Sequence, residues 1–403
     1  MAPLTTNGPL NGYRVLDLAD EKGLPCTRFL GDLGADVVKI ERPGGDATRA
    51  IPPFARDHPH PERSLYFLHW NANKRGITLD LDTADGQTLF RELAKGADNV
   101  VETTRPGTME SRGLGYGALT EINPGIVVTS ITTFGQTGPY HEYAGDELIA
   151  FALSGVMALS GEPSGPPCIA PGDLGSGMAS MYAALATMAA FFGRLQSGRG
   201  QHIDVSVAEA AANVGGYAIP YYSYFHQKAV RVSHTETSFE LHDVYECKDG
   251  YVRLFILVRD HWRTFLEWMG SPEELCDPIF EDQDIRRDNR DLVDPYVVEF
   301  CKRFTKQELY LEGQKRHLSI SPMRTPAEFV ESEQTRAREY FVPMQHAVIG
   351  TYPQARAMHV FSATQAEMRL SAPLVGEHNR AIFVDELGLT LDDLADLRAT
   401  GVI

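Results

Sequence analysis

The first 135 residues alternate short β-rich runs with stretches of helical periodicity, and this alternation constrains the fold more than any other feature of the chain. The β-rich runs cover residues 13–19, 36–41, 99–103 and 126–134, and helical patterns cover residues 26–35 and 84–97. Chains with this order form a sheet of mostly parallel strands with helices packed against it. The run IVVTSITTF is apolar on both faces, as is typical of a buried parallel strand. We therefore predict an α/β fold with a Rossmann-like, open, mostly parallel sheet.

A long Ala-rich helix and a second, smaller domain are predicted further along the chain. Residues 176–195 carry large apolar side chains at spacings of three and four, and the small residues beside them would let other helices approach closely. Residues 244–256 alternate as a two-stranded hairpin that turns at residues 248–250, and acidic helical stretches follow. The tail, residues 380–403, is predicted to form two amphipathic helices. The predicted organisation is a large domain over residues 1–205, a linker over 206–230, a small α+β domain over 231–330, and a linker with a C-terminal return to the large domain over 331–403.

Composition disfavours several classes of function. With 403 residues, of which 43% are hydrophobic and 23% charged, the chain is long enough for a large and a small globular domain. A net charge of −17 disfavours nucleic-acid binding, because phosphate backbones repel such a surface. No run reaches about 18 apolar residues, the N-terminus lacks a signal-peptide pattern, and the five cysteines are scattered without metal-ligand spacing. We expect a cytoplasmic protein with no metal, no nucleic-acid partner and no membrane partner.

Motifs of common nucleotide and hydrolase sites are missing. The first β-rich run is followed by DEKGLPCT rather than by G-x-G-x-x-G, so the glycines that cradle a dinucleotide are absent there. The P-loop, zincin and nucleophile-elbow motifs are absent as well. The sequence therefore disfavours an NAD or FAD cofactor and the chemistry of those three motifs.

Five basic residues in three turn-like segments are candidates for binding an anionic ligand. They are Arg42 in KIERPGGD, Lys74 and Arg75 in WNANKRGITLDL, and Arg105 and Arg112 in TTRPGTMESRGL. Ligands of open sheets collect beyond the carboxyl ends of the strands, where we expect Arg42 and Arg105 to lie. The alternative is that these residues are solvated surface charges without a specific role.

Asp173 is the candidate nucleophile. It lies in IAPGDLGSGMAS, directly before the long helix, where small neighbours leave its carboxylate open and the helix N-terminus favours both a negative charge and a nearby oxyanion. Glu147, in YAGDELIAFALSG, begins another helix, predicted to be buried, and would bring a second carboxylate to the same strand ends. For both residues the alternative is an ordinary acid at a helix start.

Taken together, these segments resemble the family III CoA-transferases, which include formyl-CoA, carnitine and bile-acid CoA-transferases. The resemblance covers nearly the whole chain, through GYRVLDL, LGADVVKIERPGGD, WNANKRGITLDL, RPGTME, INPGIVVTSITTFGQTGPY, GDLGSGMASMYAAL, GRGQHIDVSVAEA and APLVGEHN. It implies an interlocked homodimer whose large domains bind CoA. It also implies an enzyme that moves CoA from an acyl-CoA to a small carboxylic acid, with the CoA thioester as substrate and no permanently bound cofactor.

The resemblance assigns roles to individual positions. The family's nucleophilic aspartate falls on Asp173 and its second acid on Glu147, and its CoA-contacting basic positions fall on Arg42 and Lys74. In the family, the carboxylate attacks an acyl-CoA to give an acyl-aspartyl anhydride. CoA then returns to form an aspartyl-CoA thioester, from which the acceptor acid takes the CoA.

Some segments depart from the family pattern. DEKGLPCT stands where a small-Gly-Pro element is usual, Thr103 and Thr104 replace an Asn-aromatic pair, and Ser111 replaces a basic residue. The glycine-rich loop that closes over the active site of formyl-CoA transferases has no counterpart near 231–245. The donor and acceptor acids are therefore not inherited from the formyl enzymes.

Two other functions remain open. Related 2-methylacyl-CoA racemases share the aspartate but use a histidine as second base, at the position where this chain has Asp146. Alternatively, the chain is a CoA-binding subunit of a two-chain transferase, paired with a paralogue. The presence of Asp173 favours a chain that is itself active.

Overall fold

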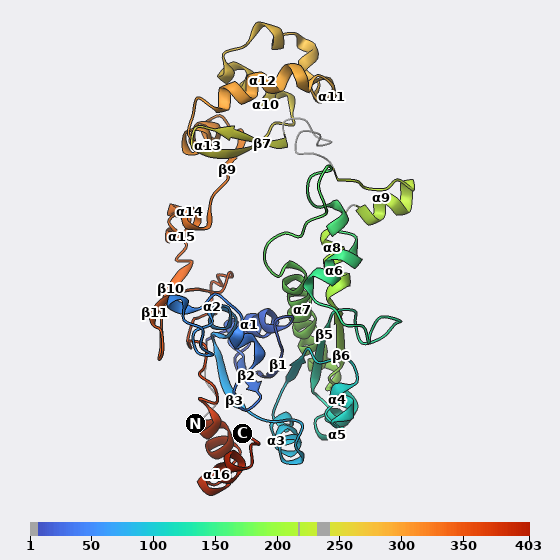
Figure 1. Ribbon diagram of the computed structural model, residues 1–403, viewed down its shortest axis with the longest axis vertical. Helices are drawn as coiled ribbons and strands as arrows, with labels where there is room; N and C mark the ends of the chain where they lie inside the picture. Colours follow the sequence, from blue (N-terminus) through green and yellow to red (C-terminus); the bar gives the residue numbers. More distant parts are fainter. Residues whose placement is uncertain (1–6, 217, 232–241) are drawn as a thin grey trace. The chain divides into compact units, whose positions relative to one another are not determined.

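The computed structural model describes residues 7–216, 218–231 and 242–403, and it divides into two compact units. The larger unit comprises Met1–Ala158, Ile169–Lys228 and Ala337–Ile403, and the smaller unit comprises Leu159–Cys168 and Ala229–Arg336 (Figure 1). Residues 206–230, expected to be a linker, contain helices α8 (Val207–Val214) and α9 (Ala218–Phe225).

A sheet of six parallel strands, counted over the described residues, forms the centre of the larger unit and confirms the predicted α/β fold class. Its strands are β1 (Arg14–Leu18), β2 (Asp36–Glu41), β3 (Lys74–Thr78), β4 (Asn99–Glu102), β5 (Val127–Thr132) and β6 (His202–Ser206). The spatial order is β3-β2-β1-β4-β5-β6, so the order reverses between β1 and β4. Sheets of this order bind ligands beyond the carboxyl ends of the strands, near the reversal.

Strand β3 corrects the sequence prediction, which has Lys74 and Arg75 in a turn-like segment. Both residues lie in this edge strand, where Lys74 pairs with Val37 and Arg75 pairs with Val38 of β2. All residues of β3 are buried. The strand tolerates two buried cations because carboxylates from distant parts of the chain neutralise them, and the local sequence does not reveal those partners.

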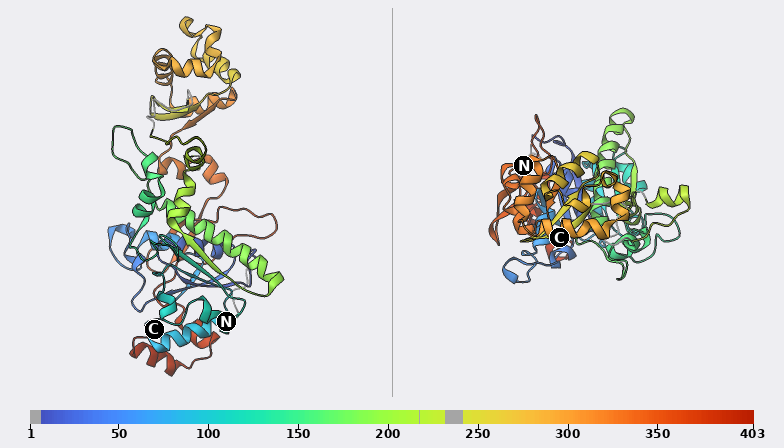
Figure 2. Two further views of the ribbon diagram at one scale, coloured as in Figure 1. Left: turned by 90° about the vertical axis from the view of Figure 1, so that its right-hand side faces the viewer. Right: turned by 90° about the horizontal axis from the view of Figure 1, so that it is seen from above.

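Helices cover both faces of the sheet, and alternate strand residues point into two hydrophobic cores. The covering helices are α1 (Leu24–Asp32) and α7 (Leu174–Ser197) on one face, and α3 (Ala84–Lys95) and α16 (Leu391–Ala399) on the other (Figure 2). Val15 of β1 packs with Phe191 of α7, whereas its neighbour Leu16 packs in the core that contains Phe90 of α3.

Helix α7 confirms the predicted long helix and reveals which of its faces is buried. Small residues such as Ala179 and Ala183 pack toward the sheet, whereas Met181, Leu185 and Phe192 are 53%, 61% and 68% exposed. Among the described helices, α7 has the length and apolar composition of a membrane span, but half of its most apolar window is buried inside this unit. Met181, Leu185 and Phe192 therefore lie outside the core of this unit, whereas Phe191 of the same helix is part of it.

Shorter elements complete the larger unit. They are α2 (Leu65–Asn71), α4 (Thr108–Ser111), α5 (Tyr116–Ile122), α6 (Glu147–Ser154), the antiparallel pair β10 (Phe341–His346) and β11 (Gly350–Ala355), a π-helix over Arg380–Glu386, and 3-10 turns over Ala47–Ala50, Ala55–Asp57 and Met157–Leu159. Phe383 and Leu394 of the C-terminal tail pack in the same core as Leu16.

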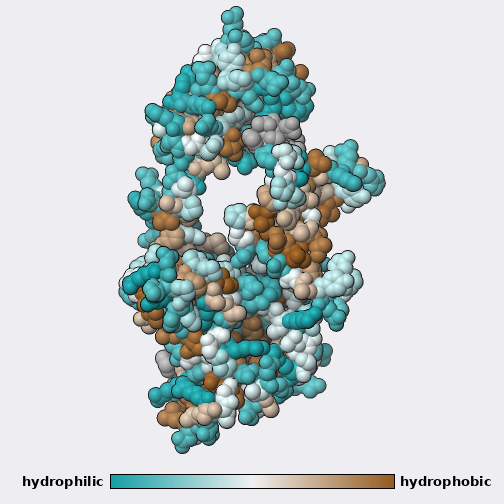
Figure 3. All heavy atoms as spheres, in the orientation of Figure 1, coloured by the Kyte–Doolittle hydropathy of each residue, from teal (hydrophilic) through white to brown (hydrophobic). Residues whose placement is uncertain are grey.

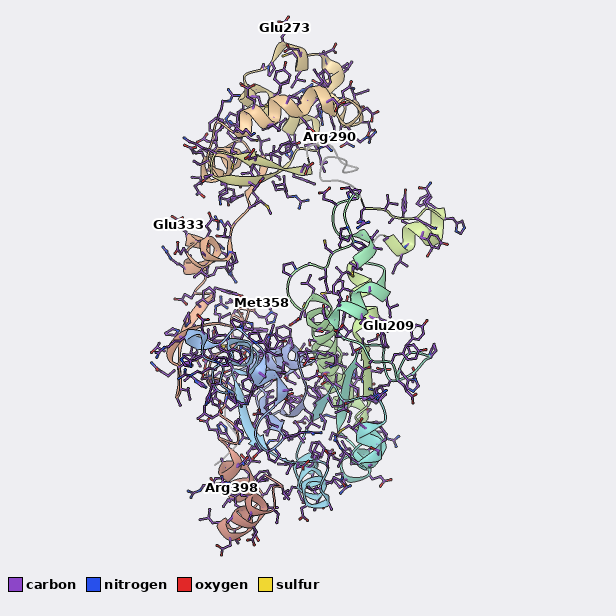
Figure 4. All side chains as sticks on the ribbon, viewed as in Figure 1. Glu209, Glu273, Arg290, Glu333, Met358 and Arg398 are labelled. Atoms are coloured by element: carbon purple, nitrogen blue, oxygen red, sulfur yellow. The ribbon has the colours of Figure 1, made fainter. Side chains whose placement is uncertain are left out.

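The smaller unit combines helices with an antiparallel sheet, which in its described residues has the order β7-β8-β9. Its elements are β7 (His242–Cys247), β8 (Gly250–Phe255), α10 (Arg259–Met269), 3-10 turns over Glu273–Leu275 and Pro278–Glu281, α11 (Gln283–Asp288), α12 (Arg290–Cys301), α13 (Lys306–Lys315), β9 (Ser319–Pro322) and α14 (Pro326–Val330), and α15 (Glu333–Ala337) follows. The predicted hairpin is present as β7 and β8. Arg290, at the start of α12 in Figure 4, donates a hydrogen bond of 3.0 Å to Asp243 of β7.

Candidate active site

A cleft of about 940 Å³ runs across the carboxyl ends of the parallel strands in the larger unit. Its walls include residues that follow five strands: Asp20 after β1, Arg42 after β2, Leu79 after β3, Thr103 after β4 and Thr133 after β5. Its volume lies near the upper end of the range of small-molecule sites, roughly 300–1,000 Å³. The cleft therefore lies where an open sheet of this order is expected to bind its ligand.

Three of the five predicted anion-binding residues, Arg42, Arg105 and Arg112, line this cleft. The side chain of Arg42 is 72% exposed, and Arg105, also exposed, donates to the backbone oxygen of Glu142 at 2.7 Å. Arg42 and Arg112 both contact the carboxylate of Asp82, at 3.3 and 2.5 Å. The cleft thus presents guanidinium groups, which suit a phosphate or carboxylate ligand.

Lys74 does not reach the surface of the cleft. Its side chain is fully buried, and Nζ donates to Asp17 Oδ2 at 2.9 Å, to Thr27 Oγ1 at 2.8 Å and to Asn71 Oδ1 at 3.0 Å. Burial lowers the pKa of Lys74 to about 8, against the opposing effect of Asp17. Lys74 does not line the cleft, so its predicted contact with the ligand stays a prediction that its burial disfavours.

Arg75 is also committed to the interior. Its Nε and Nη2 donate to the two oxygens of Asp36 at 2.8 and 2.6 Å, and its Nη1 donates to Glu386 at 2.5 Å. This bidentate pair ties β3 to the start of β2 and to the C-terminal π-helix. Arg75 does not line the cleft in this structure, so its predicted contact with the ligand stays a prediction that its carboxylate partners disfavour.

Asp173 directly precedes α7 but does not cap it. In the described structure its side chain accepts no hydrogen bond from the first turn of the helix. Gly172, whose φ of +88° suits glycine, forms the turn that presents Asp173 to solvent. The carboxylate of Asp173 accepts a hydrogen bond of 3.0 Å from the hydroxyl of Tyr66. These contacts contradict the alternative that Asp173 is an ordinary helix cap.

Glu147 supplies the cap that Asp173 does not. Its Oε1 accepts from the backbone amide of Gly175 at 2.6 Å, and its Oε2 accepts from the amide and hydroxyl of Ser176 at 2.9 and 2.7 Å. These two amides are therefore not free to stabilise an oxyanion, which corrects the predicted role of the start of α7. Glu147 also begins a helix that is only partly buried, because Leu153 of α6 is 58% exposed.

Tyr66 is held beside Asp173 by the short helix α2. Ser64 caps this helix, since its hydroxyl accepts from the backbone amide of Phe67 at 3.1 Å. Burial, and then the carboxylates of Asp173 and Glu21, raise the pKa of Tyr66. The phenol therefore stays protonated at neutral pH and remains a hydrogen-bond donor to Asp173.

The loop after β1 borders both the cleft and the neighbourhood of Asp173. Asp20 and Lys22 line the cleft, and the backbone oxygen of Lys22 accepts from Ser180 of α7 at 2.8 Å. Glu21, between them, is close enough to Tyr66 to affect its pKa. The loop after β1 thus lines the cleft and also contacts α7, the helix that begins directly after Asp173.

Residues 10–379 match the family model of CoA-transferase family III. The chain belongs to CoA-transferase family III. It is 34% identical to the succinyl-CoA:(R)-benzylsuccinate CoA-transferase subunit BbsE of Thauera aromatica, with 97% of each chain covered. It is 32% identical to the succinyl-CoA–D-citramalate CoA-transferase of Chloroflexus aurantiacus, with 98% of each covered. A CaiB/BaiF family protein from Brucella suis has the same fold, with a TM-score of 0.85 and 30% identity over 94% of this chain and 100% of that one.

As a family III CoA-transferase, the protein is an enzyme of a class whose substrates are CoA thioesters. Sequence reasoning missed two residues of this site, Tyr66 and Asp82. No local pattern marks either residue, because their partners Asp173 and Arg112 lie 107 and 30 positions away. The segment 231–245, where the sequence lacks the family's glycine-rich loop, falls largely outside the described residues.

Proposed function

We propose that this family III CoA-transferase moves CoA between carboxylic acids through a covalent intermediate on Asp173. The observation that carries the proposal concerns two carboxylates at the start of α7: Glu147, from another helix, caps α7, and Asp173, at the cap position, does not. Glu147 occupies the amides of α7, so the carboxylate of Asp173 stays exposed and uncapped, with Tyr66 as its donor. A nucleophile needs such an accessible, oriented group.

The proposed reaction consists of acyl substitutions. Asp173 attacks the thioester carbonyl of the donor and expels the CoA thiolate, which leaves an acyl-aspartyl anhydride. The thiolate then attacks the aspartyl carbonyl, releases the donor acid and forms an aspartyl-CoA thioester. The acceptor carboxylate reverses these two steps, giving a new acyl-CoA and free Asp173. Each step exchanges one activated carbonyl for another, so the sequence needs no ATP.

In this proposal CoA binds in the cleft at the strand ends, with its phosphates near Arg42, Arg105 and Arg112. The cleft lining and the exposure of Arg42 support this placement. The thioester end would then extend past the loop after β1 toward Asp173. Glu147 acts as a positioning residue, because its three hydrogen bonds fix the first turn of α7 next to the nucleophile.

We propose succinyl-CoA as the first donor to test, since both named relatives above use it by name. The enzyme is incubated with succinyl-CoA, treated with hydroxylamine or borohydride, and digested for peptide mass analysis. A mass change on the peptide that contains Asp173 is expected, and an Asp173→Asn variant serves as control. An adduct on Glu147 or on a cysteine would assign the nucleophile elsewhere. The donor and acceptor acids are then found by mass spectrometry of the CoA products from a panel of acids.

Racemase activity is the second candidate. Asp146 stands where the racemase histidine would be, and its carboxylate accepts from the backbone amide of Ile149 at 3.0 Å as the cap of α6. A racemase exchanges the α-proton of its substrate with solvent, whereas a transferase does not need to. Deuterium incorporation into a 2-methylacyl-CoA in D₂O, without any CoA transfer, would favour this candidate.

The proposed assembly is an interlocked homodimer in the cytoplasm. Several large apolar side chains of α6 and α7 are exposed in the single chain, and Figure 3 shows hydrophobic residues gathered over α6 and α8. Exposed apolar patches of this kind favour a protein partner. A heteromer with a paralogue is the alternative, because several relatives are named as subunits. Activity of the purified single chain, and the absence of hybrids after mixing tagged with untagged enzyme, are expected. Rapid hybrid formation contradicts interlocking.

A further inference from the structure

Asp82, in the segment between β3 and α3, binds two of the three arginines of the cleft. Its Oδ1 accepts from Nε and Nη2 of Arg112 at 3.0 and 2.5 Å, and its Oδ2 accepts from Nη2 of Arg42 at 3.3 Å. All three residues line the cleft. The carboxylate therefore occupies guanidinium donors that an anionic ligand would use.

Asp82 differs from two other acids of the cleft wall. Glu41 is paired with Arg49 at 2.6 Å, and Asp46 with Lys39 at 3.2 Å, and neither of those cations lines the cleft. Those pairs are part of the scaffold, and a ligand need not disturb them. Asp82 is instead paired with cations of the ligand-binding wall itself.

The ion pair between Arg42 and Asp82 can be replaced by one between Arg42 and a ligand. Their side chains are 72% and 54% exposed, and exposed ion pairs are weak because water screens them. A phosphate carries more charge than a carboxylate and matches the planar fork of a guanidinium. A phosphate group that enters the cleft can therefore displace the carboxylate of Asp82 from Arg42 without unfolding any element.

We propose that Asp82 is an internal counter-anion that competes with a phosphate of CoA for Arg42 and Arg112. This inference rests on the proposed binding of CoA in the cleft. In the free enzyme Asp82 neutralises the two guanidinium groups. In the complex its displaced charge repels the bound phosphate, which lowers the affinity and speeds release of the product acyl-CoA. Asp82 is thus an affinity-determining residue rather than a catalytic one.

The test is the isosteric variant Asp82→Asn, with CoA binding measured by isothermal titration calorimetry. We expect the Kd for CoA to fall roughly five-fold, because the amide keeps the shape but removes the competing charge. KM for the acyl-CoA should fall with it, and kcat should fall where product release limits turnover. The matched control is Asp85→Asn, which makes the same charge change at an exposed position on the first turn of α3. If Asp85→Asn increases the affinity for CoA as much as Asp82→Asn does, the increase comes from the net charge of the enzyme, and the proposal is wrong.

A double-variant cycle shows whether Asp82 competes with CoA for Arg42 or holds Arg42 in place for CoA. If Asp82 competes with CoA for Arg42, then Arg42→Ala should weaken CoA binding more in the Asp82→Asn background than in the wild type. If Asp82 instead holds the arginine in place for CoA, Asp82→Asn alone should weaken binding, and the proposal is wrong. Wild-type enzyme that does not bind CoA would overturn the proposed function as well. Wild-type binding with an unchanged Asp82→Asn overturns this inference alone.

Discussion

Basic side chains occupy two contrasting regions of the larger unit. Lys74 and Arg75, inside β3, are surrounded by carboxylates that neutralise them. Arg42 and Arg105, in the turns that follow β2 and β4, extend into the cleft at the strand ends. All four residues have the same charge and come from similar polar segments. The difference shows that a basic side chain is available to a ligand only where the fold does not supply it with a permanent carboxylate partner.

The two carboxylates at the start of α7 repeat this contrast. Glu147 receives two backbone amides and a hydroxyl, whereas Asp173 receives only the phenol of Tyr66 among the described contacts. Position along the helix would favour Asp173 as the cap. The structure instead gives the cap to Glu147, which comes from another helix, and leaves the carboxylate of Asp173 exposed and uncapped.

Replacing Asp173 or Glu147 by its amide should change kcat more than the other substitutions do, and the two variants should differ strongly from each other. Asp173→Asn keeps the shape but removes the proposed nucleophile, so we expect kcat to fall roughly 10³-fold or more, about 4 kcal/mol of transition-state stabilisation. CoA affinity should stay near that of the wild type. Steady-state kinetics and calorimetric titration with CoA measure the two quantities.

Glu147→Gln is the matched comparison. The amide can still accept one hydrogen bond but now presents its NH₂ group to a backbone donor, so we expect a local loss of about 1–3 kcal/mol and a smaller decrease in kcat. Covalent labelling of Asp173 should persist in this variant. If Glu147→Gln abolishes turnover while Asp173→Asn retains it, the roles of the two residues are reversed.

The sequence predicts the sheet and the long helix, because these depend on local periodicity, and segments of family-like sequence lead to the proposal that Asp173 is the nucleophile. It does not predict the burial of Lys74, because its partner Asp17 lies 57 residues away. It does not predict the capping role of Glu147 either, since the amides that Glu147 binds belong to a helix 28 residues further along the chain. Local patterns therefore locate charged groups, and tertiary packing decides which of them remain free.

Lys74→Ala should destabilise the fold. It removes one partner of a buried ion pair and leaves Asp17 without its countercharge, which costs about 3–5 kcal/mol of folding free energy. The control Lys95→Ala breaks an exposed pair with Glu92 and should cost less than about 1 kcal/mol. Thermal and urea unfolding of the purified enzymes compare the two.

A double variant keeps this prediction testable even if Lys74→Ala fails to fold. In Asp17→Asn combined with Lys74→Met, neither residue carries a charge, so most of the lost stability should return. CoA affinity in that double variant should match the wild type. A specific loss of CoA affinity in a stable double variant would restore Lys74 to the ligand-binding residues.

The smallest effect is expected for Arg42→Ala, which tests the exposed arginines of the cleft against the buried cations of β3. The free energy of unfolding should change little, because the pair with Asp82 is exposed. The free energy of CoA binding should weaken by about 1–2 kcal/mol, which raises the Kd roughly 5–30-fold. Higher ionic strength should reduce this difference, since salt screens an exposed phosphate contact. Arg199→Ala removes another exposed arginine, which precedes β6 and so lies at the amino ends of the strands, and it should leave the Kd unchanged. Equal losses in the two variants would mean that CoA responds to the overall charge of the enzyme and not to the cleft at the strand ends.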